Sequence, residues 1–194
     1  MSLEPFRNWV KQVPFLEEED CLLFESALKV RSYAKKDWVI QAGQVCRELG
    51  FINKGAFRLF YITDEGKEIN THFFFENEFL ADYRSFLDQA PSHYYIAAIE
   101  PAEVVFFDYS TLQNAYQQSP RWSQFGRLMA EQAYKISMDR TASFLFYEGK
   151  ERYLELEKNA AHILQRVPLY HIASYLGLER ESLSRLRKKI AENK

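Results

Sequence analysis

The stretch HIASYLGLERESLSRLRKKI, residues 171–190, carries the pattern that decides the fold. Ile172, Leu176 and Leu178 form the apolar side of a short helix and its turn. Gly177 stands where the chain must reverse, and glycine is the residue type that adopts left-handed backbone without steric cost. The pattern therefore predicts a helix that ends in a tight turn at Gly177.

A second helix follows the turn. Leu183, Leu186 and Ile190 recur at i, i+3 and i+7, which is the spacing of one buried helical face. Ala173 lies four residues before Gly177, and so small a residue lets the two helices cross closely. This is the spacing of a helix-turn-helix, whose second helix enters the major groove of DNA.

The outer faces of this second helix are polar and mostly cationic. They carry Arg180, Glu181, Ser182, Ser184, Arg185, Arg187, Lys188 and Lys189. Arg180 stands at the N-terminal end, where the helix dipole disfavours a cation, so a DNA phosphate or a guanine edge would account for it. A helix that is merely solvated is the alternative, and the full spacing favours DNA.

The charge of the chain is divided unevenly. Residues 1–149 contain 15 Lys+Arg and 21 Asp+Glu, whereas residues 150–194 contain 10 Lys+Arg and 6 Asp+Glu. Such an asymmetry indicates that the basic segment meets a polyanion, although chance composition is the simpler alternative.

Residues 31–108 read as short strands separated by turn signals. The runs are DWVI (37–40), LGFINK (49–54), AFRLFYI (56–62), EINTHFFF (68–75), YYIAAI (94–99) and EVVFFD (103–108). Asp64-Glu65-Gly66 between two of them is a hairpin signal, because glycine supplies the positive φ. Strands of this length and spacing predict a β-sandwich or barrel.

A long helix is predicted after the strands. Ser119 is a good N-cap and Pro120 a good first helical residue, and apart from Gly126 no breaker follows before Gly149. Its apolar stripe contains Trp122, Phe125, Met129, Ala133, Ile136 and Phe144. Because such a helix is longer than a small barrel can cover, we expect a dimer seam; packing on its own domain is the alternative.

The segment IASYLGLERESLSRLRKKI, residues 172–190, resembles the helix-turn-helix of the Crp/Fnr transcription regulators. INKGAFRLFYITDEGKEI, residues 52–69, resembles the glycine-centred strand pair of their cyclic-nucleotide-binding-type barrel. The resemblance implies an α+β fold: a jelly-roll sensor barrel at residues 1–118, a dimerisation helix at 119–148 and a winged-helix-like helix-turn-helix at 149–194. It also implies a homodimer that binds double-stranded DNA.

The family's DNA-reading pattern, Arg-Glu-x-x-x-Arg, falls on Arg180, Glu181 and Arg185. Arginine can bind guanine at two atoms and glutamate can accept from cytosine. Four further residues would contact phosphates: the hydroxyls of Ser182 and Ser184, and the cations Lys188 and Lys189. The chain departs from the family in two ways, since Glu179 replaces the usual Ser or Thr cap and any wing must be short or absent.

The family's phosphate cassette, a Gly-Glu pair followed by an Arg, falls on Ala81-Asp82 and on Ser92, or with a slip His93. The aligned residues lack the glycine and the cation, so we expect neither cyclic AMP nor cyclic GMP to bind. Arg84 could substitute for the missing arginine only from the near side of the loop. Together with Tyr83, these residues predict a degenerate pocket whose effector, if any, is unknown.

Other classes of protein are less compatible with the sequence. The histidines, His72, His93, His162 and His171, form no metal or nucleophile pattern, so we expect no enzyme, metal or cofactor. Cys21 and Cys46 are too few for an iron–sulfur cluster, and reduced thiols without a signal peptide or a membrane span predict a cytoplasmic protein. The serious alternative is a ligand- or protein-binding barrel that dimerises but does not bind DNA specifically.

Overall fold

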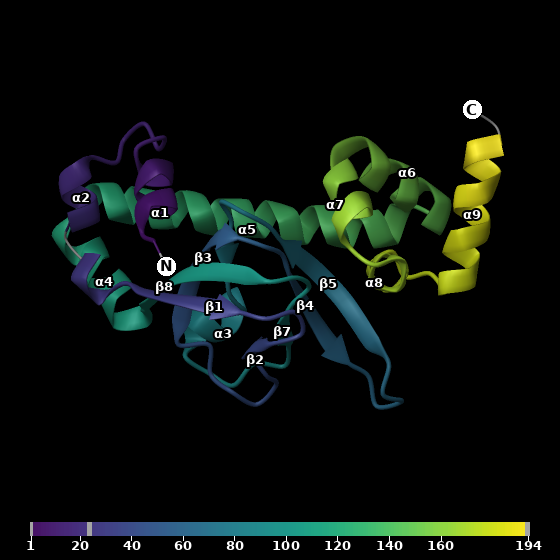
Figure 1. The fold of residues 1–194 in the computed structure, drawn as a ribbon, viewed down its shortest axis with the longest axis horizontal. Helices are drawn as coiled ribbons and strands as arrows, with labels where there is room; N and C mark the ends of the chain where they lie inside the picture. The colour runs from purple at the N-terminus through teal and green to yellow at the C-terminus, as the bar shows by residue number, and fades with distance from the viewer. Residues whose placement is uncertain (1, 23–24, 193–194) are drawn as a thin grey trace. The chain divides into compact units, whose positions relative to one another are not determined.

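A computed structural model of the chain describes residues 2–22 and 25–192, and for Cys21 and Leu22 the backbone alone. The chain divides into two compact units (Figure 1). The first comprises residues 1–59 and 73–132, and the second comprises residues 60–72 and 133–194. The predicted domain boundaries at residues 118 and 148 stay predictions.

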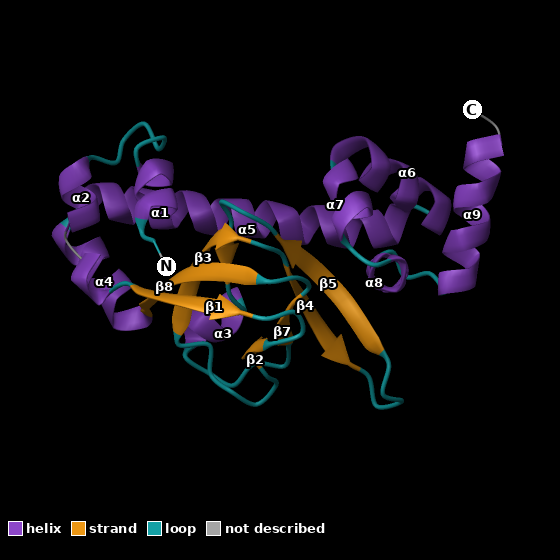
Figure 2. Ribbon diagram, in the orientation of Figure 1, coloured by secondary structure: helices purple, strands orange, loops and turns teal. Residues whose placement is uncertain are grey.

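The strands form two four-stranded sheets (Figure 2). The first sheet has the order β1 (Lys29–Tyr33), β8 (Ala102–Asp108), β3 (Glu48–Lys54) and β6 (Phe79–Leu80). The second has the order β2 (Trp38–Ile40), β7 (Tyr95–Ala98), β4 (Phe57–Ile62) and β5 (Glu68–Phe74). The β-sandwich expected from the sequence is therefore confirmed, and β5 lies at the edge of its sheet.

All six predicted runs are strands, with ends that differ by at most one residue. The hairpin at Asp64-Glu65-Gly66 is also confirmed: the Gly66 N–H donates to the Thr63 carbonyl at 2.8 Å, and Gly66 has a φ of +80°. Two strands, β1 and β6, were not predicted. β1 pairs antiparallel with β8 from Lys29 opposite Phe106 to Tyr33 opposite Ala102.

Apolar side chains from both sheets meet in one core. Ile52 and Val104 of the first sheet and Phe57 and Ile96 of the second are completely buried there. Since successive side chains of a strand point to opposite faces, Phe51 and Val105 lie on the other face of the first sheet. These two belong to a second apolar cluster.

The second cluster covers this outer face with helices. It contains Phe6, Val10, Leu16, Phe51, Val105, Ala115, Trp122 and Phe125. The residues come from α1 (Glu4–Val10), α4 (Tyr109–Gln118), α5 (Pro120–Phe146) and the first sheet. Two short elements, α2 (Glu18–Leu22) and a 3-10 turn at Glu25–Ala27, complete the N-terminal segment.

The start of the apolar stripe on α5 packs inside the chain. Trp122 and Phe125 are buried in the second cluster, and Met129 packs against it. These turns therefore follow the alternative of a helix packed on its own domain, and their apolar side chains are not available to a dimer seam. The helical period of the apolar residues identifies a face that must be buried, but it does not identify the surface that buries it. Here that surface is the chain's own sheet and helices.

The predicted helix start is confirmed. The hydroxyl of Ser119 accepts from the Trp122 backbone N–H at 3.4 Å and donates to the buried carboxylate of Asp20 at 2.6 Å. The Trp122 indole N–H donates to the Asp20 carbonyl at 2.9 Å. These bonds satisfy the Trp122 backbone N–H in the first turn of α5 and join that turn to α2.

Residues 149–192 contain helices and no strand. The helices are α6 (Gly149–Asn159), α7 (Ala161–Arg166), α8 (Leu169–Tyr175) and α9 (Arg180–Glu192). Only Val167 and Pro168 join α7 to α8. The described residues therefore contain no wing hairpin at this place in the helix-turn-helix. Nowhere in residues 2–22 and 25–192 is a helix both long and apolar enough to span a membrane.

We predict that Gly55→Ala destabilises the barrel more than Gly43→Ala. Both glycines have positive φ, +96° and +88°, so either alanine is strained by about 1–2 kcal/mol. A Cβ at Gly55 would also lie 2.5 Å from the Ala102 Cβ and 2.7 Å from its Cα, whereas a Cβ at Gly43 meets no atom within 4 Å. Urea denaturation should show an extra loss of at least about 1 kcal/mol for Gly55→Ala. Equal losses would contradict this packing at the crossing between the sheets.

Candidate nucleic-acid interface

One glycine sets the turn between α8 and α9. Gly177 has a φ of +66°, and its N–H donates to the Ser174 carbonyl at 3.1 Å. The Leu178 N–H donates to the Ala173 carbonyl at 2.9 Å, which completes a Schellman motif. A Cβ at residue 177 would lie 2.8 Å from the ring of Phe144, so backbone and space both require glycine. The predicted left-handed turn is confirmed.

The two helices share a small apolar core. Ile172 and Leu176 of α8 and Leu183 of α9 are fully buried, and Leu186 and Ile190 are half-buried. The inner face of α9 is therefore the one expected from its spacing. Burial of Leu183 turns the opposite side of α9 outward.

The outward side of α9 carries the predicted DNA-binding residues. Arg180, Glu181, Ser184, Arg185, Lys188 and Lys189 are exposed, and Ser182 is half-buried. The Arg185 guanidinium donates to the Ser182 hydroxyl at 3.5 Å, and Lys188 lies 3.9 Å from Glu192. Exposed pairs of this kind contribute little energy, so DNA phosphates can replace them.

Two arginines that the sequence did not indicate hold the end of α8. Arg140 donates to the Tyr175 carbonyl at 3.2 Å, and Arg152 donates to the Leu176 carbonyl at 3.0 Å. Both guanidinium groups also lie over the ring of Phe144, at 4.9 Å and 4.5 Å from its centroid. The last carbonyls of a helix lack intrahelical donors, so these cations complete the C-terminus of α8.

Two predicted residues of the degenerate cassette bind each other. The Ser92 hydroxyl donates to the Asp82 carboxylate at 2.7 Å, and both side chains are buried. Asp82 also caps α3 (Tyr83–Asp88) by accepting from the Ser85 N–H at 3.4 Å. The Ser92 hydroxyl, which aligns with the family's arginine, is thus already engaged by a carboxylate, and neither side chain supplies a positive charge.

The other predicted pocket residues bring no cation to this pair. Ala81 is buried beside Asp82, and Tyr83 is half-buried, which raises the pKa of its phenol. The side chain of Arg84 is exposed and lies 3.6 Å from Asp88. His93 is also exposed, whereas Ser92 is buried.

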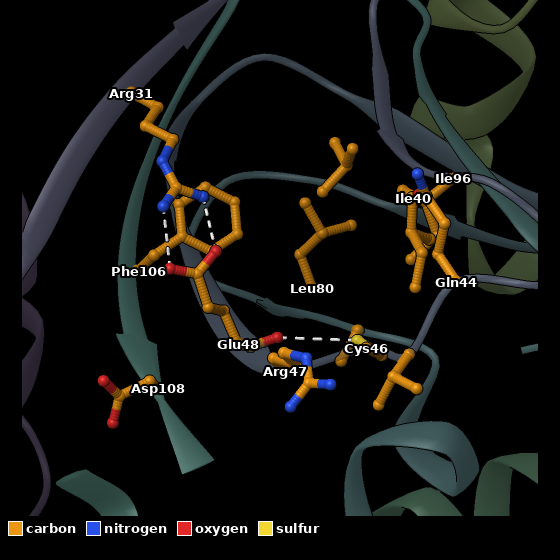
Figure 3. A pocket seen from close by; sticks show the side chains of 13 residues that line it. Arg31, Ile40, Gln44, Cys46, Arg47, Glu48, Leu80, Ile96, Phe106 and Asp108 are labelled. Carbon is orange, nitrogen blue, oxygen red and sulfur yellow. Dashed lines mark hydrogen bonds and ion pairs between the residues drawn. The ribbon is translucent and has the colours of Figure 1, made fainter. Parts of the chain in front are cut away.

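A cavity of about 590 Å³ opens beside the cassette (Figure 3). Its apolar lining includes Val39, Ile40, Leu80, Ala81, Ile96 and Phe106. The Arg31 guanidinium lies 4.8 Å from the Phe106 ring centroid and binds Glu48 through two hydrogen bonds, one of 2.7 Å. These bonds raise the pKa of Arg31. Of the two arginines that line the cavity, Arg31 is thus already paired with a carboxylate, whereas Arg47 is exposed.

The Cys46 thiol also lines this cavity. It donates to the Glu48 carbonyl at 3.5 Å, and burial raises its pKa to about 11. It is therefore a protonated, unreactive thiol at neutral pH. Across the described side chains, no group of three or more His, Cys, Asp or Glu residues is arranged to hold a metal ion.

The cyclic nucleotide-binding domain family matches residues 30–119, and no curated protein matches the chain by sequence. Among solved structures, FixK2 from Bradyrhizobium japonicum matches with a TM-score of 0.73 and 19% identity over 86% of this chain and 85% of that one. The chain has the fold of the Crp/Fnr transcription regulators.

Two further solved structures are similar to this chain. The c-di-GMP-responsive global regulator CLP from Xanthomonas campestris has a TM-score of 0.70 and 18% identity, covering 91% of this chain and 93% of its own. A CooA variant from Carboxydothermus hydrogenoformans has a TM-score of 0.72 and 18% identity, covering 94% and 84%. At these identities the likeness concerns the fold, and the predicted α+β architecture of barrel, long helix and helix-turn-helix is confirmed.

We predict that cyclic AMP and cyclic GMP do not bind at micromolar concentrations. Ser92 offers a phosphate a neutral hydroxyl in place of the family's guanidinium, and this hydroxyl already donates to Asp82. Loss of one charge-assisted hydrogen bond costs about 1.5–3 kcal/mol. Isothermal titration should detect no saturable heat up to about 100 μM nucleotide. Binding of one nucleotide per subunit below about 10 μM, roughly −7 kcal/mol, would contradict the prediction.

Proposed function

We propose that the protein is a DNA-binding transcription regulator of the Crp/Fnr type, which reads DNA with α9. The observation that carries the proposal is the division of this helix into two sides. Leu183 is buried against α8, while Arg180, Glu181 and Arg185 are exposed. Since α9 follows a glycine turn in the helix-turn-helix arrangement, its exposed side is the one that would enter a major groove.

The exposed residues suit base edges and phosphates. Arg180 and Arg185 can each donate to both O6 and N7 of a guanine, and Glu181 can accept from the amino group of a cytosine. Ser182, Ser184, Lys188 and Lys189 would bind the phosphate backbone, which sets register and adds affinity without sequence preference.

We further propose a homodimer whose seam is the other face of α5. Tyr134, Met138 and Leu145 are 66%, 47% and 72% exposed, although all three are large and apolar. Their spacing of four and seven residues places them on one face of the helix. A second copy of this chain would cover that face, and its two-fold symmetry suits two half-sites about one helical turn apart.

The remaining assignments follow from this function. We propose that the protein is cytoplasmic, is not an enzyme and uses no cofactor, with the barrel as a sensor of an unidentified effector or as a filled core. The alternative is a barrel module that dimerises without binding DNA specifically. A gel shift on genomic fragments separates the two, since only a regulator retards particular fragments against excess competitor DNA.

Base reading by α9 can be tested by substitution. On a duplex obtained by selection, Arg185→Ala should cost about 1–3 kcal/mol per half-site and relax the base preference, because a bidentate contact is lost. Lys189→Ala is the control: it should weaken all sequences alike and reduce the salt dependence. Fluorescence anisotropy measures both effects. If Arg185→Ala left affinity and preference unchanged, α9 would not be the recognition helix.

The second prediction concerns the dimer. Light scattering at micromolar concentration should give twice the chain mass of 23.0 kDa. Met138→Glu should shift the protein to monomer, because it places a carboxylate in the apolar seam, whereas Ser137→Glu on a different face should not. A monomeric wild-type protein, with and without DNA, would remove this part of the proposal.

A further inference from the structure

The hairpin between β4 and β5 lies in the same compact unit as the C-terminal helices. That unit combines residues 60–72 with residues 133–194. As an edge strand, β5 presents backbone groups that no neighbouring strand satisfies, and such groups must find another partner when they are covered. Their partner here is α8.

A single hydroxyl binds two of these backbone groups. The Asn70 N–H donates to the Ser174 hydroxyl at 3.0 Å, and that hydroxyl donates to the Glu68 carbonyl at 2.7 Å. Ser174 lies in the last turn of α8, and its backbone carbonyl also closes the turn at Gly177. The hydroxyl therefore joins the edge of the sheet to the helix end from which α9 departs.

Two further contacts surround this bridge. The side-chain amide of Asn70 lies 3.3 Å from Nδ1 of His171, and both side chains are buried. Arg140 of α5 donates to the Asn70 carbonyl at 3.0 Å as well as to the Tyr175 carbonyl. Burial makes these polar groups costly to separate, because each would lose its partner away from water.

The hairpin also reaches the start of α9. Lys67 forms an ion pair with Glu179, the residue directly before Arg180. Both side chains of the pair are exposed, so its energy is small and the buried contacts at Ser174 and Asn70 carry the attachment. With the hairpin attached, Arg180, Glu181 and Arg185 remain exposed, so the attachment leaves the reading face open.

We propose that the β4–β5 hairpin is a positioning element for DNA binding, and that Ser174, Asn70 and Arg140 are the positioning residues. The hairpin fixes α8, and the glycine turn transmits that position to α9. Its strands continue into the first unit, where Phe57 and Phe74 are buried in the barrel core. This inference rests on the proposed function.

The test compares Ser174→Ala with Ser174→Thr and with Ser137→Ala, an exposed serine of α5 that takes no part in the bridge. Ser174→Ala should bind the selected duplex at least tenfold more weakly. Base preference and salt dependence should stay unchanged, since no DNA contact is removed. Ser174→Thr keeps the hydroxyl and should recover affinity to within about threefold, and Ser137→Ala should match the wild type.

Hydrogen–deuterium exchange of residues 169–192 supplies a readout that needs no DNA. Ser174→Ala should speed exchange in α8 and α9 at least tenfold, with the far-UV circular dichroism of the protein retained. If the wild type binds DNA and Ser174→Ala binds equally well or more tightly, the positioning role is overturned. If the wild type binds no duplex, the proposed function fails, and unchanged exchange in Ser174→Ala would then overturn the attachment as well.

Discussion

The left-handed turn at Gly177 is the constraint on which the DNA-binding part of the molecule depends. Its two hydrogen bonds to Ala173 and Ser174 set the direction in which α9 leaves α8. The ring of Phe144 fills the space that any side chain at residue 177 would need, and two arginines stack on that ring. The same arginines bind the last carbonyls of α8, so one set of contacts joins the turn, the helix end and the C-terminal part of α5.

The charged side chains of the barrel differ from those of the helix-turn-helix in burial and in pairing. At the helix-turn-helix, cations are exposed and paired weakly, so a polyanion can replace their partners. In the barrel, Asp82 is buried with Ser92, and Arg31 is bound to Glu48. The prediction that no cyclic phosphate binds therefore depends on these side chains and not on the fold. The fold sets the position of the cassette residues, and the charge and pairing of their side chains determine whether an anion can bind.

Much of the fold could be predicted from local signals. Strand runs, the hairpin at Gly66 and the turn at Gly177 each depend on residues within a few positions of one another. β1 was missed because Lys29, Arg31 and Ser32 are polar and leave few apolar positions in so short a run, and because its partner β8 is distant in sequence. The stripe on α5 was recognised, but its period could not reveal that Trp122 and Phe125 face the chain's own core.

Some features of the candidate site could likewise be predicted from the sequence, and others depend on packing between distant residues. The exposed face of α9 followed from its helical period, and the mismatch of Ala81-Asp82 and Ser92 to the cassette was visible in the alignment. The hydrogen bond from Ser92 to Asp82 was not, because it spans ten residues and depends on the loop geometry. Arg140, Arg152 and Ser174 carry no motif, and only the packed structure brings them to the end of α8.

In vitro selection of duplexes bound by the full chain tests the central claim most directly. The account predicts enrichment of a pseudo-palindrome whose half-sites lie about 10 base pairs apart, centre to centre, with a guanine in each half-site for an α9 arginine. Enrichment of no sequence, at salt concentrations where the protein is folded and dimeric, would contradict the account.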